Sequence, residues 1–91
     1  MRFEFGHSHA YPGCLLRIPE DADGLRGQED IVEFSDGAVA DARHQARDGA
    51  IVLHVAPYRT ARGTAIEAKT WLLEPDGEPG RWRVRRRLSA A

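Results

Sequence analysis

The sequence predicts an all-β protein, a single small antiparallel meander of six to seven short strands that is either barrel-like or a two-layer sandwich. Turn signals recur at near-even intervals of roughly a dozen residues, which is typical of short strands joined by hairpins. Between them, several segments alternate apolar and polar residues as half-buried strands do. The last third, residues 65–88, is typical of one long hairpin and holds both tryptophans. The turn signals are Pro12-Gly13, Asp23-Gly24, Asp36-Gly37, Asp48-Gly49, Gly63 and Asp76-Gly77.

Length and composition limit what the chain can be. Ninety-one residues suit a single domain, 1–91, which buries roughly 60–65% of its unfolded surface. Hydrophobic residues make up 42% and charged residues 30%, as in an ordinary soluble globular protein. No apolar run approaches the ~20 residues that span a bilayer, and no signal peptide is recognisable, so we expect no membrane partner. The single cysteine, Cys14, permits no internal disulfide, which favours a cytoplasmic location.

The net charge of −1 hides an asymmetry along the chain. Residues 1–56 hold five arginines and ten Asp or Glu, a net −5, whereas residues 57–91 hold eight Lys or Arg and four Asp or Glu, a net +4. In one domain, much of this charge can be neutralised between the two parts. Dedicated nucleic-acid binders are usually basic overall, so the total charge argues against that class.

Four segments before residue 57 are predicted strands. Residues 2–5, 14–18 and 31–34 each alternate so that one side can face a core. Residues 51–56 are the most apolar run and lack a polar side, so we place this strand centrally, with both faces at least partly covered, and Pro57 ends it or marks an edge. The side chains expected to face the core from the first three segments are Phe3, Phe5, Cys14, Leu16, Ile18, Val32 and Phe34.

Residues 38–47 permit two interpretations. Alanine richness, a cap at Ser35 or Asp36 and Gly49 beyond the end suit a short helix, which would make the fold α+β. The apolar stripe of that helix would be mostly alanine and would bury little. Flanking Asp-Gly turns favour a strand paired with 51–56, and we prefer this interpretation. Residues 19–24 are predicted to be an acidic loop, and the tail from Ser89 is expected to be frayed.

The C-terminal hairpin has a predicted register. Residues 65–74 and 81–88 form its strands, and 75–80, with two prolines and two glycines, form its loop. Closing the loop at Glu74 and Arg81 gathers both indoles on one face, and a slip by one residue would set each apolar side chain opposite an arginine. The predicted pairs are Glu74–Arg81, Leu73–Trp82, Trp71–Val84 and Lys69–Arg86.

An arginine row occupies alternate residues of the last predicted strand, where side chains share one face at ~6.5–7 Å spacing. That spacing suits successive phosphates of a single nucleic-acid strand, with Tyr58 offering a ring for base stacking. A solvated face, or an edge strand kept charged against aggregation, explains the row equally well. The candidate residues for binding an anion or a partner are Tyr58, Arg59, Arg62, Lys69, Arg81, Arg83, Arg85 and Arg87.

The segment 57–64 concentrates hydroxyls, arginines and a glycine, a composition suited to anion recognition by side chains and backbone N–H groups. It has one glycine and no Gly-Lys-Ser/Thr, so it is not a phosphate-binding glycine-rich loop. The alternative is structural, with Gly63 in a turn, Thr60 and Thr64 bonded to the local backbone, and Tyr58 packed on the core edge.

We predict no metal site. The alternative is a site that includes His7 and His9. They would project from the same side of a strand, with Cys14 or His54 as a third ligand. No carboxylate lies nearby in sequence and no Cys-x-x-Cys accompanies them, so partly exposed polar histidines are the simpler explanation. We predict no cofactor.

Nothing in the sequence positions a catalytic set. Cys14 is followed by two leucines and most lone cysteines are inert core residues, and no Ser, His and Asp are placed together by spacing. We therefore predict a non-enzymatic domain that binds another protein or a second copy of itself through exposed strand edges. The alternative is binding of single-stranded nucleic acid, or another polyanion, through the arginine face of the C-terminal strand.

Overall fold

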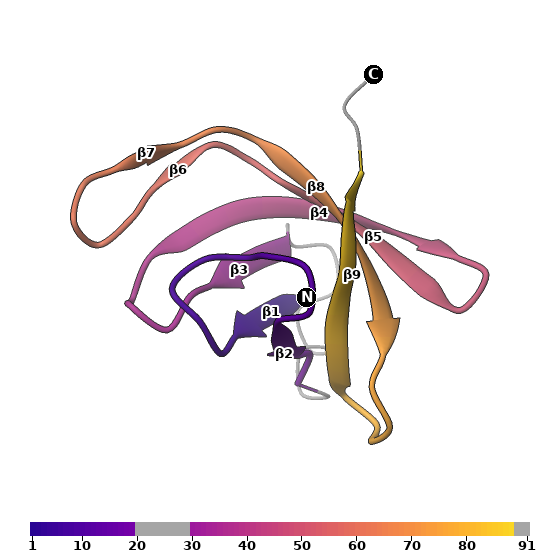
Figure 1. The fold of residues 1–91 in the computed structure, drawn as a ribbon. Helices are drawn as coiled ribbons and strands as arrows, with labels where there is room; N and C mark the ends of the chain where they lie inside the picture. The colour runs from indigo at the N-terminus through magenta and orange to yellow at the C-terminus, as the bar shows by residue number, and fades with distance from the viewer. Residues whose placement is uncertain (20–29, 89–91) are drawn as a thin grey trace.

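The computed structural model describes residues 1–19 and 30–88, which form a closed seven-stranded β-barrel and a two-stranded arm (Figure 1). Those ranges contain no helix, so the all-β prediction is confirmed, and the barrel form is the one observed. The Asp23-Gly24 turn, most of the predicted acidic loop and the tail from Ser89 lie outside the described residues. Within the described ranges, no helix is long and apolar enough to cross a membrane.

The barrel order is β1-β2-β9-β8-β5-β4-β3, and β6 and β7 form the arm. The expectation of a wholly antiparallel sheet is wrong at one seam, because β1 pairs parallel with β3, as Phe3 lies opposite Val32. That pair closes the sheet, and closure removes most of the free edges that an open meander would leave. The strands are β1 (Arg2–Phe5), β2 (Leu15–Arg17), β3 (Asp30–Glu33), β4 (Val39–Arg47), β5 (Ala50–Val55), β6 (Tyr58–Arg59), β7 (Ala65–Ile66), β8 (Lys69–Pro75) and β9 (Arg81–Leu88).

Residues 39–47 are strand β4, so the helix alternative at 38–47 is wrong. β4 pairs with β3 on one side and β5 on the other, which satisfies its backbone hydrogen bonds without a helix. Ala40 and Ala42 point into the core. The turn between β4 and β5 has positive φ at both Asp48 (49°) and Gly49 (83°), as a two-residue hairpin turn requires.

The register of the C-terminal hairpin differs from the predicted one. Leu73 lies opposite Val84 instead of Trp82, a shift of two residues, because Pro75 belongs to β8 and pairs with Trp82. A two-residue shift preserves the faces, so both indoles still lie on the inward side. Trp71 is buried, and Trp82 is half-buried against the core.

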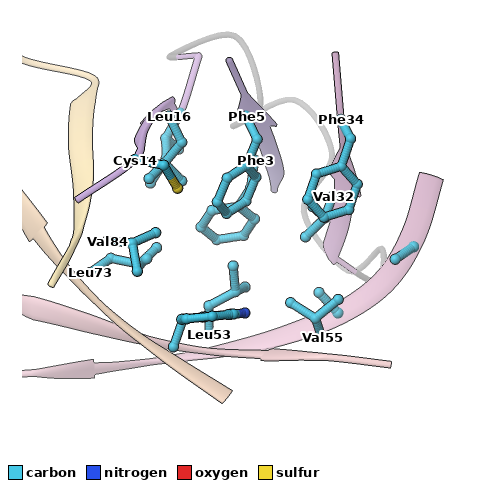
Figure 2. Packing of buried hydrophobic residues seen from close by; sticks show 14 of the residues in the cluster. Phe3, Phe5, Cys14, Leu16, Val32, Phe34, Leu53, Val55, Leu73 and Val84 are labelled. Atoms are coloured by element: carbon cyan, nitrogen blue, oxygen red, sulfur yellow. The ribbon is translucent and has the colours of Figure 1, made fainter. Parts of the chain in front are cut away.

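The core fills the barrel with side chains from every barrel strand (Figure 2). All seven side chains expected to face inward from the N-terminal segments are buried. On β5, Leu53 faces the interior, and Val52 is buried on the opposite, outward side, so both faces of this strand are partly covered as predicted. The side chains with less than 2% exposure include Phe3, Cys14, Leu16, Val32, Leu53, Leu73 and Val84.

The arm leaves the barrel after β5 and returns into β8 (Figure 1). At its base, the Tyr58 ring stacks on Phe34, with the centroids 4.9 Å apart and the planes at 14°. Near its tip, the Asp36 carboxylate of the β3–β4 turn accepts hydrogen bonds from the backbone N–H of Ala38 (2.9 Å) and Ala61 (3.3 Å). The arm is thus anchored to the barrel at two points.

Candidate anion-binding site

The arginine row is largely neutralised by neighbouring carboxylates. Arg81 forms an ion pair with Asp76 (3.1 Å), and Glu74 accepts hydrogen bonds from both Arg83 (2.5 Å) and Arg85 (3.1 Å). Those two hydrogen bonds hold the pKa of Glu74 below its usual value, and the Glu74 carboxylate raises the pKa of Arg83. Three of the four arginines predicted to form a free cationic face are therefore paired.

A β-bulge at Arg85 separates Arg87 from the rest of the row. Val84 and Arg86 lie opposite two successive residues of β8, so no residue of β8 lies opposite Arg85 in the ladder. The bulge reverses the alternation of side chains along the strand. Arg87 consequently lies opposite Trp71, on the inward side of the sheet.

Arg87 joins two other cations in a groove of about 460 Å³ where β4, β5, β8 and β9 meet. Arg43 comes from β4 and Lys69 from the start of β8. None of the three forms an ion pair within residues 1–19 and 30–88. Among the described lining residues, Asp41 is the single carboxylate, so the groove has an excess of positive charge.

Two hydrogen-bonding side chains lie on the wall of the groove. His54 and Thr70 are a cross-strand pair of β5 and β8, with the imidazole Nδ1 3.1 Å from the hydroxyl oxygen. Both are half-buried and can hydrogen-bond a ligand in addition to each other. The groove therefore combines three cations with an imidazole and a hydroxyl, which suits a carboxylate or phosphate.

The outward face of the sheet beside the groove is also basic. Arg86 lies on this face opposite Leu72, and Arg47 is an outward residue of β4, as is Arg43, which already lines the groove. Buried Val52 and half-buried Leu72 give the face an apolar centre. An anionic segment in the groove would therefore meet further positive charge along its path.

The edge of β9 is open beside the groove. β2 pairs with residues 81–83 of β9, and Gly13 and Cys14 exchange backbone hydrogen bonds with Val84 (2.7 and 2.9 Å). Residues 86–88 pair with β8 on one side. On the side where β2 pairs with residues 81–83, residues 85–88 pair with no strand of the described ranges. The open edge can thus accept the main chain of an extended ligand.

The other predicted binding residues lie on the arm. Arg59 donates a hydrogen bond to the carbonyl oxygen of Gly63 (2.9 Å), and the backbone N–H of Thr64 donates to the Thr60 hydroxyl (3.1 Å). These contacts, with the stacking of Tyr58, match the structural alternative for segment 57–64. Arg59 and Arg62 do not line the groove; of the eight predicted residues, Lys69 and Arg87 do.

The sequence analysis did not place Arg43 and His54 together in a candidate anion site, although a signal for their pairing existed. A two-residue turn at Asp48-Gly49 fixes the β4–β5 register, and that register pairs Arg43 with His54. Arg87 had no such signal, because the bulge that directs it to the groove is not encoded by a Gly or Pro.

His7 and His9 lie in a bend and not on a strand, so the expectation that they project from the same side of a strand is wrong. Both rings lie beside Tyr11, with centroids 5.2 Å from its ring. Cys14 is buried, and burial raises the pKa of its thiol. No cluster of three or more His, Cys, Asp or Glu able to hold a metal ion is found in the described part of the chain.

Comparison of the chain with protein-family models, curated proteins and solved structures finds no match. A larger hollow of about 910 Å³ adjoins Pro19, where the first described range ends. Its described lining holds two acidic and two basic side chains, which are Glu4, Glu78, Arg17 and Arg81.

Proposed function

We propose that this chain is a non-enzymatic interaction domain that binds an acidic segment of a partner protein in the groove of Arg43, Lys69 and Arg87. The observation that carries the proposal is the contrast between the two groups of cations. Arg81, Arg83 and Arg85 are paired with carboxylates, whereas Arg43, Lys69 and Arg87 line one groove and form no ion pair within the described ranges, although Asp41 is also in the lining. A carboxylate ligand would supply the missing partners.

An acidic protein segment fits the groove better than a single-stranded nucleic acid. Proteins that bind single strands combine basic grooves with aromatic rings on which bases stack. The described lining residues of the groove include no aromatic ring other than the His54 imidazole, and the Tyr58 ring stacks on Phe34. Carboxylates on the cations, with main-chain pairing along the open edge of β9, require no such platform.

A second copy of the chain is a poorer partner for the same edge. Residues 85–87 are three consecutive arginines, and an antiparallel pair of two such edges would bring like charges together. We therefore expect a monomer by size-exclusion chromatography with light scattering. The lone, buried Cys14 supports a reducing compartment, the cytoplasm, as the place of action.

Binding should be weak and sensitive to salt, because each exposed ion pair contributes only about 0.2–1 kcal/mol. The test is the fluorescence anisotropy of a labelled peptide of glutamate and alanine, titrated at low and at physiological salt. Replacing two groove cations in Lys69→Gln/Arg87→Gln should weaken binding about tenfold. The matched control, Arg17→Gln/Arg62→Gln, removes the same charge elsewhere and should change affinity less than about twofold.

Two results would overturn the proposal. Equal losses of affinity in both double variants would mean that binding depends on net charge and not on the groove. Absence of peptide binding even at low salt would mean that the groove does not bind acidic segments. A labelled oligonucleotide that binds tighter than the peptide, and loses affinity in Lys69→Gln/Arg87→Gln, would replace the acidic segment with nucleic acid.

A further inference from the structure

A third cavity, of about 190 Å³, lies between the arm and the barrel. Its walls are mainly apolar and come from the barrel and from both strands of the arm. They include Phe34, Val55, Tyr58, Ile66 and Trp71, and the acidic and basic residues of the described lining are Glu67 and Lys69. A cavity of this size takes one large side chain and not a folded segment.

This cavity and the cationic groove adjoin each other and share two lining residues. Val55 and Lys69 line both, and the two residues lie opposite each other in the β5–β8 ladder. Arg87, in the groove, lies opposite Trp71, in the cavity wall. A ligand that fills the cavity therefore leaves its flanking groups close to Lys69 and Arg87.

The cavity walls are held in place by packing. The Phe34 ring is stacked between Phe5 (centroids 5.2 Å apart) and Tyr58, and Trp71 is 5% exposed. Burial, with the nearby charge of Asp36, raises the pKa of Tyr58, which keeps its hydroxyl neutral. In protein interfaces, a large anchor side chain commonly fills a preformed pocket that is surrounded by polar residues. An apolar cavity beside charged side chains fits that arrangement.

We propose that the cavity takes an aromatic side chain of the same acidic partner segment, so that the recognised motif is an aromatic residue flanked by Asp or Glu. The inference rests on the proposed function and deepens it. The aromatic ring supplies burial and the carboxylates supply charge. Lys69, on the border of the two sites, receives the carboxylate next to the ring.

The test uses three labelled peptides of equal length. One is acidic with a central phenylalanine, the second is acidic with alanine in its place, and the third keeps phenylalanine but has glutamine for every glutamate. The first should bind about tenfold tighter than the second, because burial of the ring adds to the ion pairs. The third should bind more weakly than the first.

A variant that fills the cavity isolates the anchor. Ile66→Trp should remove the advantage of phenylalanine and leave the affinity of the alanine peptide unchanged. The control, Val39→Trp, places the same side chain at a position that is 50% exposed and does not line the cavity. Independently of any variant, the phenylalanine peptide should shift the indole N–H resonance of Trp71, and the alanine peptide should not.

The outcomes separate the two proposals. If both acidic peptides bind equally well and both depend on Lys69 and Arg87, the groove stands and the anchor fails. If no acidic peptide binds, both fail. If free phenylacetate binds as tightly as the phenylalanine peptide, the cavity is a small-molecule site and the anchor is again overturned.

Discussion

Leu73 lies directly opposite Val84 in the β8–β9 ladder, and both side chains are fully buried. Leu72 precedes Leu73 in the sequence. It lies on the outward face of the sheet, opposite Arg86, and is half-buried. Between these two ladder pairs the bulge turns β9, so one strand contributes to the core, the outward face and the groove. The register of this hairpin is therefore what relates the fold to the proposed site.

The two leucines should differ in their contribution to stability. Leu73→Ala leaves a cavity in the core and should lower the free energy of unfolding by about 2–5 kcal/mol. Leu72→Ala removes the same atoms from a half-exposed site and should cost less than about 2 kcal/mol. Urea denaturation followed by circular dichroism measures both, and equal losses would contradict the register.

Glu74 should stabilise the fold at neutral pH and not in acid. Its pKa is lower in the folded chain than in the unfolded one because Arg83 and Arg85 donate hydrogen bonds to it. The stabilisation is therefore present above the unfolded pKa and lost as the pH falls through the lower, folded value. We expect Glu74→Gln to be less stable than the parent at neutral pH and equal to it in acid. A difference in unfolding free energy that is independent of pH would argue against this ion-paired role.

Two glycines of the β8–β9 loop provide a matched pair. Gly77 and Gly80 both have φ of +81°, which disfavours any other residue. They differ in their surroundings: a Cβ on Gly80 would lie 3.2 Å from the carbonyl oxygen of Ile18, whereas a Cβ on Gly77 would contact nothing within 4 Å. Ile18 donates a backbone hydrogen bond to Gly80 (2.8 Å), so the two segments cannot separate freely. Gly77→Ala should cost about 1–2 kcal/mol. Gly80→Ala should cost more, and thermal unfolding that ranks the two the other way would refute the contact.

Cys14 should resist alkylation in the folded chain. Its thiol is 1% exposed, its pKa is raised by burial, and its Sγ accepts a hydrogen bond from the Tyr11 N–H (3.5 Å). Thiolate is the reactive form, so burial and a raised pKa both slow the reaction. The rate of labelling by iodoacetamide should be low in buffer and rise through the urea unfolding transition. Rapid labelling without urea would mean that the β1–β2 connection opens on its own.

Local patterns were sufficient for most of the fold. Alternation predicted the buried faces of residues 2–5 and 31–34, and Asp48-Gly49 indicated the turn that joins β4 to β5. Long-range features were not accessible in this way. The parallel β1–β3 seam depends on closure of the whole sheet, and the pairing of Pro75 with Trp82 contradicts the usual place of proline in a loop.

The candidate site was harder to predict than the fold. A regular strand would have kept Arg87 beside Arg85, and the bulge at Arg85 moved it across the sheet to Lys69. The neutralising partners of the remaining arginines depend on a register that differs by two residues from the predicted one. Glu74 was expected opposite Arg81 and instead lies opposite Arg83.

The most direct test of the groove is a nuclear magnetic resonance titration of the isotope-labelled chain with the unlabelled glutamate and alanine peptide. The largest shifts of backbone amide resonances should fall on Arg43, His54, Lys69, Thr70 and Arg87, and they should fade as salt is added. Shifts centred on Arg81 and Arg83, or on the tip of the arm at Arg62, would contradict the assignment of the binding surface.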